Sequence, residues 1–353
     1  MKLNSEKAIM IKARAAKSRL LSKRMYDEIL HKESAEAVLA YLISETEYAP
    51  SLADLQGMSS WRDDFEERLR RHLDGYYQGV LCFAPATDSF YSFVITEMEV
   101  EALTTILQDL MSQKGRASSK PPQPLPAVML SATRLDFSRL AKASTFPDLL
   151  KELKGSPYYK PLLASASHSE IGFDFPVAER DLRDLQGKRM LEAISRIPSQ
   201  EERSKLSAYY AALVELADLE LLYRLKGFVA FSPGRISSYL VAKPAMLRQR
   251  EWQSLIAASD RGSLMRLLGD TSLGKRMKQL SPNLSFEEAY FNTLTARLLY
   301  HNSHKLLKSA YEGPSAFLAM VTLARNEVRN LITIMEGKFY GMSVEKLSPY
   351  LVY

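Results

Sequence analysis

The feature that most constrains this chain of 353 residues is a short pattern that occurs three times, at intervals of about a third of its length. The first copy is Leu39, Leu42, Ser44, Thr46, Tyr48, Pro50 and Leu52. The same spacing recurs without a gap 111 residues later as Leu150, Leu153, Gly155, Pro157, Tyr159, Pro161 and Leu163. A third copy, 225 residues after the first, keeps the apolar positions but not the tyrosine or the proline, as Leu264, Leu267, Gly269, Thr271, Leu273, Lys275 and Met277. Self-similarity at a fixed period is typical of repeated structural parts, so we expect three related domains.

Each copy predicts a helix, a tight corner and a second helix. Two leucines three residues apart lie on one face of a helix. The position of Ser44, Gly155 and Gly269 is expected to end that helix, because a C-cap favours a residue that tolerates a left-handed backbone. The Thr/Pro/Thr position that follows suits the start of the next helix. Tyr48 and Leu52, four residues apart, are then expected on its inward face, as are Tyr159 and Leu163.

A second pattern near the end of each third supports the repeat. An acid is followed by apolar residues four and seven positions later, which is typical of a helix face with its acid at the rim, at Glu99 with Leu103 and Ile106, at Asp218 with Leu222 and Leu225, and at Glu327 with Leu331 and Ile334. The fold predicted from both patterns is all-α, with three similar helical domains over residues 1–115, 128–243 and 244–353.

Long helices and one linker complete the expected organisation. Apolar residues recur in steps of three and four over residues 315–336 and 206–225, while alternating strand patterns are scarce. The segment 112–127 is rich in serine and proline and includes Gly115, so residues 116–127 are predicted to be an extended linker.

Composition and charge narrow the function classes. A single cysteine, Cys82, excludes an intramolecular disulfide, and no apolar run is long enough to span a membrane. Of the net charge of +6, residues 1–24 carry eight basic residues against one acid, whereas the remainder has 39 basic and 40 acidic residues. The main body is therefore neutral, which argues against nucleic-acid binding. The basic leader fits a solvated first helix best, with a transit peptide or an anionic-membrane contact as alternatives.

The candidate chemical motifs do not make an active site. Residues 269–276 resemble a phosphate-binding loop, but Arg276 stands where a magnesium-binding serine or threonine is required, and a helical rather than a strand pattern precedes them. His301 and His304, three residues apart on a predicted helix, are only two potential metal ligands. His168 lacks the glycines of a nucleophile elbow. We therefore predict no catalytic residues, no metal, no cofactor and no small-molecule ligand.

Two stretches resemble a known family. The segment from Leu20 to Tyr26, which includes Leu21, is followed by Tyr48 and Leu52. It is similar to the opening of the C subunit of bacterial and archaeal V/A-type ATPases (ATP synthases), the relative of the d subunit of eukaryotic V-ATPases. The closing stretch, residues 326–351, resembles the C-terminal signature of the same family. Tyr159, in the second copy of the repeat, is expected to be a further signature residue. The closing signature residues are Glu327, Arg329, Asn330, Leu331, Gly337 and Lys338.

The resemblance implies a fold and a role. It implies three similar helical domains around a pseudo-threefold axis that form a funnel. It also implies a non-catalytic rotor subunit of the central stalk, peripheral on the cytoplasmic face of the membrane, whose partners are the central shaft subunits and the membrane proteolipid ring. In this role the chain serves ATP-driven ion transport or ATP synthesis. A generic helical scaffold or a nucleic-acid-associated protein is the alternative.

Overall fold

A computed structural model describes residues 2–57, 61–84, 90–112, 132–167, 171–227, 231–241 and 243–353. These residues form helices and no strand, apart from an isolated antiparallel bridge between Ala166 and Phe173. The all-α prediction is confirmed over this part of the chain. The predicted linker at residues 116–127 lies outside it.

The chain divides into two compact units. The first consists of Met1–Ala86, Ser204–Ala230 and Lys243–Tyr353, and the second of Thr87–Arg203 and Phe231–Ala242. The second unit therefore combines the last helix of the first third with the opening helices of the second third. The division into three similar domains stays a prediction.

The first unit contains most of the helices. Its N-terminal part has α1 (Lys2–Arg19), α2 (Lys23–Leu30), α3 (Ala35–Glu45), α4 (Ala49–Leu52), the 3₁₀ turn η1 (Ala53–Leu55) and α5 (Trp61–Leu81). Nearly all of α12 (Gln200–Leu225) belongs to it as well. The remaining elements are α14 (Gln249–Ala257), α15 (Arg261–Asp270), α16 (Ser272–Leu280), η2 (Glu288–Tyr290), α17 (Phe291–Lys308), α18 (Gly313–Phe339), α19 (Val344–Leu347) and η3 (Ser348–Tyr350).

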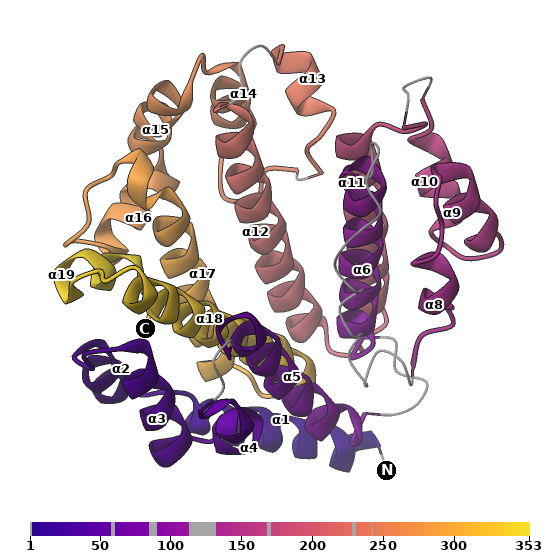
Figure 1. The fold of residues 1–353 in the computed structure, drawn as a ribbon. Helices are drawn as coiled ribbons and strands as arrows, with labels where there is room; N and C mark the ends of the chain where they lie inside the picture. Colours follow the sequence, from indigo (N-terminus) through magenta and orange to yellow (C-terminus); the bar gives the residue numbers. More distant parts are fainter. Residues whose placement is uncertain are drawn as a thin grey trace. The chain divides into compact units, whose positions relative to one another are not determined.

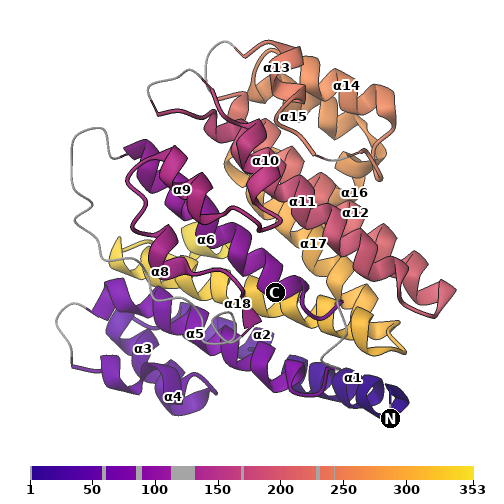
Figure 2. The ribbon, with the colours of Figure 1, turned by 90° about the vertical axis from the view of Figure 1, so that its right-hand side faces the viewer.

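Helix α18 is the centre of the first unit. It contacts α1 and α5 on one side and α17 on another (Figure 1 and Figure 2). It buries apolar residues around much of its circumference, including Phe317, Met320 and Leu331. This is the pattern of a core helix rather than an amphipathic surface helix. The prediction of a helix over residues 315–336 is confirmed, although the helix continues past Gly337 to Phe339 and the left-handed glycine that follows it is Gly341, with φ +62°.

The second unit is built on a pair of long helices. Helix α6 (Phe93–Ser112) packs against α11 (Phe175–Ser195), which also contacts α10 (Tyr159–Ala164). Its short helices among the described residues are α8 (Phe137–Leu140), α9 (Phe146–Glu152) and α13 (Pro233–Ser237). The rings of Phe146 and Phe173 stack at 4.6 Å between centroids, and both side chains are buried.

The corners of the three copies differ from the prediction in where the first helix ends. Gly155 has φ +88° and does follow α9, as a left-handed residue at a helix end should. Ser44 and Gly269, however, lie inside α3 and α15, so their assignment as helix-ending residues was wrong. The extended residues Thr46 and Thr271 end these helices instead, and their hydroxyls donate to the carbonyls of the residues that precede the corner.

The ungapped register of the second copy was also wrong by one residue beyond the corner. The Thr46 hydroxyl accepts from the Tyr48 amide at 3.2 Å, and the Ser156 hydroxyl accepts from the Tyr158 amide at 3.3 Å. Tyr158 is buried, whereas Tyr159 is half-buried. Tyr158 is therefore the counterpart of Tyr48. Leu153 and Tyr158 are five positions apart, whereas their counterparts Leu42 and Tyr48 are six apart, a difference that an alignment without a gap cannot represent.

Candidate functional site

The glycine-rich segment 269–276 is a helix junction. Thr271 ends α15 and caps α16, and its hydroxyl accepts from the Gly274 amide at 3.0 Å. The Lys275 amide donates to the Thr271 carbonyl, so these amides are already bonded within the helix and do not form a phosphate cradle. A Cβ at Gly274 would lie 2.0 Å from the Leu268 carbonyl oxygen. This glycine is therefore explained by the close approach of α16 to the end of α15.

The two paired histidines are not arranged as metal ligands. The ring of His304 packs edge-on against Tyr300 at 4.5 Å, and burial lowers its pKa, while His301 is exposed. Across the described ranges no group of three or more His, Cys, Asp or Glu side chains is placed to hold a metal ion. Within the same ranges no helix is both long and apolar enough to span a membrane. His168 lies outside the described residues.

A buried polar cluster on α18 brings the two ends of the sequence together. The Glu327 carboxylate is 3% exposed and accepts a hydrogen bond from the Tyr48 hydroxyl at 2.9 Å. It also accepts from the backbone amide of Leu21, between α1 and α2, at 2.5 Å. One side chain thus ties together the last long helix, the α1–α2 connection and the α4 corner. We call such a contact a buried-acid joint: a buried glutamate on a long helix that accepts from the segment opening a third of the chain.

Asn330, one turn further along α18, extends this cluster to the C-terminus. Its amide nitrogen donates to the Tyr26 hydroxyl at 3.2 Å and to the Val352 carbonyl at 2.7 Å, and its oxygen accepts from the Val352 amide. The ring of Tyr26 stacks on Tyr353 with 4.4 Å between centroids. The tail therefore closes against both α18 and α2, with its buried backbone groups paired.

Burial has a strong effect on the ionisation of this cluster. Desolvation raises the pKa of Glu327 to about 7, against the opposing effect of the two hydrogen bonds that it accepts. Desolvation and the nearby Glu327 carboxyl also raise the pKa values of Tyr26 and Tyr48 well above their ordinary value. The cluster is most stable when its tyrosines are neutral and Glu327 is protonated.

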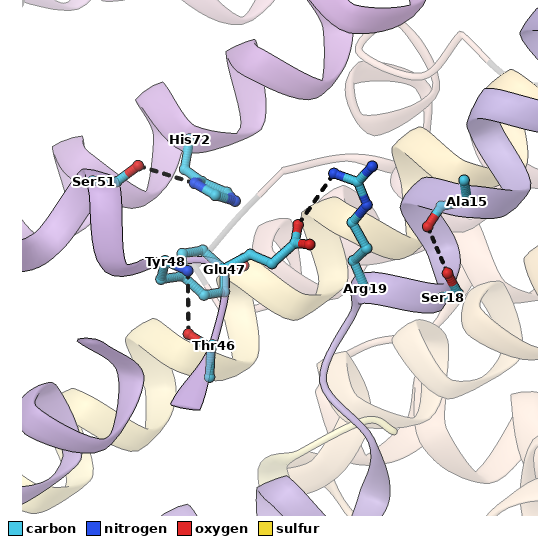
Figure 3. Close-up of polar contacts among 8 residues, drawn as sticks. All are labelled: Ala15, Ser18, Arg19, Thr46, Glu47, Tyr48, Ser51 and His72. Carbon is cyan, nitrogen blue, oxygen red and sulfur yellow. Dashed lines mark hydrogen bonds and ion pairs between the residues drawn. The ribbon is translucent and has the colours of Figure 1, made fainter. Parts of the chain in front are cut away.

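The corner at Tyr48 is covered from the side of α5 (Figure 3). The His72 ring lies against Tyr48 with 4.4 Å between centroids, and its Nδ1 is 2.9 Å from the Ser51 hydroxyl. Burial lowers the pKa of His72, which favours the neutral ring. The adjacent Glu47 pairs with Arg19 at the end of α1 at 3.4 Å, with both side chains about half exposed. An ion pair this exposed adds little stability, so the buried contacts hold the corner.

The other signature residues of the opening and closing stretches occupy structural positions. Leu52 and Leu331 are buried in the core of the first unit. Lys338 donates to the carbonyls of Leu30 and Lys32 at 2.7 and 2.6 Å, at the end of α2, as a cation at a helix C-terminus should. Arg329 is half-buried, and desolvation lowers its pKa.

Gly337 lies against α19. A Cβ there would lie 2.6 Å from a methyl group of Leu347, whose side chain would have to shift.

The second unit contains a joint of the same design. Glu99 on α6 is buried and accepts from the Tyr158 hydroxyl at 2.5 Å and from the Thr133 hydroxyl at 2.6 Å. Arg189 lies over the Tyr158 ring, 5.6 Å from its centroid. Desolvation and the bond to Glu99 raise the pKa of Tyr158. The pair of Glu99 and Tyr158 repeats the pair of Glu327 and Tyr48.

A third acid, which the sequence pattern did not single out, plays the corresponding role on α12. The Glu215 carboxylate is fully buried and accepts from three consecutive backbone amides that open the last third of the chain, at 2.6 to 3.0 Å. Asp218, the predicted counterpart, is also buried one turn away. The pattern of apolar residues at plus four and plus seven fits Glu215 as well, through Leu219 and Leu222. The sequence pattern therefore fits both acids, and the three hydrogen bonds from backbone amides are needed to single out Glu215.

Comparison with known protein families shows to which family this chain belongs. The family model for the ATP synthase (C/AC39) subunit matches residues 11–350. The chain belongs to this family. The matched range includes the Tyr48 corner, α18 and all three buried glutamates, so the resemblance seen in the sequence is confirmed.

Members of the C/AC39 family in archaea are distant relatives over nearly the full length. The C subunit of the A-type ATP synthase of Methanosarcina mazei is 22% identical over 348 residues, covering 97% of this chain and 91% of the relative. That of Archaeoglobus fulgidus is 21% identical over 98% of this chain and 95% of the relative. That of Methanothermobacter thermautotrophicus is 23% identical over 93% and 82%, respectively.

Proposed function

We propose that this C/AC39 family chain is a non-catalytic rotor subunit of the central stalk of a V/A-type ATPase. In that role it sits on the cytoplasmic side of the membrane, on the proteolipid ring, and receives the central shaft. The observation that carries the proposal is the family match over residues 11–350, together with relatives described as the C subunit of A-type ATP synthases over more than nine tenths of the chain.

The buried-acid joints support a role in transmitting torque. A coupling element has to resist shear between segments that are distant in sequence, and hydrogen bonds to a buried carboxylate are expensive to break. Glu327 accepts hydrogen bonds from Tyr48 and Leu21, which lie 279 and 306 positions earlier in the chain. Glu215 holds the backbone segment that opens the last third. Each joint therefore resists the sliding of one helix group past another within its unit.

Two motifs of the sequence that could carry chemistry have other uses in the structure. In the helix junction at residues 269–276, the amides of Gly274 and Lys275 donate to Thr271. On α17, His304 packs against Tyr300, and His301 is exposed. A coupler needs contact faces and stiffness, and neither requires a catalytic group.

A three-component binding experiment tests the proposal. The purified chain is mixed with the detergent-solubilised proteolipid ring and the purified shaft subunits of its own complex, and the mixture is separated by size. We expect one species that contains all three components, and no ring–shaft species when the chain is omitted. Failure of the chain to bind either partner contradicts the proposal. ATP hydrolysis by the isolated chain contradicts its non-catalytic part.

A further inference from the structure

Helix α1 presents a cationic face to the solvent. Its buried side is apolar and packs in the first unit through Ile9, Ala13 and Ala16. Glu6 is the only acid among residues 1–24. The cations exposed on this helix include Lys7, Lys12, Arg14 and Lys17.

Neighbouring elements extend this face. Arg14 donates to the Ala310 carbonyl at 2.8 Å, which places the loop between α17 and α18 beside α1. Lys205 of α12 is 3.4 Å from the Ser309 carbonyl in that loop, and the last turn of α17 adds Lys305 and Lys308, both exposed.

Large apolar side chains are exposed among these cations. Ile11 of α1 is 62% exposed, and Tyr311, in the loop that Arg14 contacts, is 78% exposed. Lys205 lies over the Tyr311 ring at 5.5 Å, and Lys12 lies over the partly exposed ring of Phe83 at the same distance. Leaving these side chains in water costs free energy that a partner could recover.

We propose that this cationic face, formed by α1 with Phe83, Tyr311 and the lysines beside them, docks on an anionic lipid bilayer. Its charge is complementary to acidic headgroups, and each cation near such a surface adds about 1 kcal/mol, or about fivefold in affinity. An aliphatic side chain and a tyrosine among the cations fit the boundary between headgroups and acyl chains, where amphipathic surfaces insert.

Nucleic acid fits this face less well. A phosphate backbone rewards the cations, but Ile11 gains nothing from it, and base stacking requires a series of aromatic rings along a groove. The bilayer contact goes beyond the proposed rotor function and rests on separate observations, so either can fail without the other.

The first test is flotation with vesicles, using the full-length chain. Vesicles of phosphatidylcholine containing about 30% phosphatidylserine are compared with phosphatidylcholine alone. We expect binding to the anionic vesicles only, with a loss of affinity when the salt is raised from about 0.1 M to about 0.5 M. The triple variant Lys7→Gln/Lys12→Gln/Lys17→Gln should bind about a hundredfold more weakly.

The matched control removes the same charge from exposed positions of the second unit. Lys142→Gln/Lys151→Gln/Lys154→Gln also lowers the net charge from +6 to +3, and it should keep the affinity of the unchanged chain. Ile11→Ser, which keeps every charge, should weaken binding by about tenfold. Circular dichroism confirms that each variant is folded.

The single cysteine gives a second readout. Cys82 is exposed and adjacent to Phe83, so an environment-sensitive fluorophore attached there should shift to the blue on anionic vesicles. The same label on Cys82→Ser/Ser195→Cys, in the second unit, should not shift.

Equal losses in the two triple variants overturn the proposal, as does no binding to anionic vesicles. An unchanged affinity in Ile11→Ser, or tighter binding to duplex DNA than to the vesicles, assigns the face to another partner and also overturns it.

Discussion

Replacing Glu327 with glutamine is expected to remove a large pH dependence from the stability of the first unit. A native pKa of about 7, against an ordinary value of 4.5, means that ionising this carboxyl costs about 3 kcal/mol more in the folded chain than in the unfolded one. Below about pH 4.5 both states hold the proton and the full stability is present. As the pH rises from about 4.5 to about 7, the unfolded state loses the proton first, so the free energy of unfolding falls.

Glutamine keeps the shape of the joint without the ionisation. Its oxygen can accept from the Leu21 amide, and its nitrogen can donate to the Tyr48 hydroxyl, where the acid now accepts. The free energy of unfolding of the wild-type chain, relative to Glu327→Gln, should therefore fall by about 2–3 kcal/mol between about pH 5 and about pH 8.

Urea unfolding followed by tryptophan fluorescence measures this difference. Both tryptophans, Trp61 and Trp252, lie in the first unit and report on its unfolding. Glu36→Gln, at an exposed carboxylate on α3, serves as the control and should follow the wild-type curve within about 0.5 kcal/mol. Parallel curves for the wild type and Glu327→Gln over this range would refute the reasoning, since they would mean that Glu327 ionises alike in both states.

Three further substitutions, one of them with a matched control, test the joints and the helix junctions. Tyr158→Phe should destabilise the second unit by about 1–3 kcal/mol in urea unfolding, because it removes a hydrogen-bond donor from the buried Glu99 carboxylate. Tyr159→Phe, the control, should cost less than about 0.5 kcal/mol. A larger cost for Tyr159→Phe would mean that Tyr159, not Tyr158, is the counterpart of Tyr48. Glu215→Ala should cost about 3–5 kcal/mol in the thermal or urea unfolding of the first unit, because it leaves three backbone amides without their acceptor, and a cost below about 1 kcal/mol would contradict the joint on α12. Gly274→Ala should cost about 3 kcal/mol or more by the same measurement, whereas tolerance of the added Cβ would contradict the close approach of α16 to α15.

The helices and the family could be predicted from the sequence because both depend on patterns that are local or long. The 3.6-residue periodicity of α18 is nearly uninterrupted over residues 315–336, and the opening and closing signatures bracket the whole chain. Leu21, Tyr26, Tyr48, Glu327 and Asn330 were selected from both ends of the sequence, and the structure brings these five into one cluster.

The corners could not be predicted residue by residue. The end of a helix can be followed by a left-handed glycine, as at Gly155, or by an extended threonine, as at Thr46 and Thr271. The spacing from the buried leucine to the buried tyrosine is five positions in the second copy and six in the first. An ungapped comparison cannot represent this difference, and it therefore pairs Tyr48 with Tyr159 rather than with Tyr158.

The sequence pattern did not distinguish Asp218 from Glu215, for a related physical reason. Both acids lie on the inner side of α12 and both are fully buried, so helical periodicity does not distinguish them. What marks Glu215 is the loop that enters the last third, whose three amides converge on one carboxylate. Convergence of backbone amides is a tertiary property, and no spacing in the sequence reports it.

Restoration of coupling tests the central claim most directly. Membranes that contain the ring and the catalytic head of the complex, but from which the C/AC39 chain has been removed, are assayed for ATP-driven ion transport before and after addition of the purified chain. The account predicts that transport is absent without the chain and returns on its addition, in parallel with reassembly of the shaft on the ring. Full transport in membranes that lack the chain, or reassembly that leaves ATP hydrolysis and transport uncoupled, would contradict it.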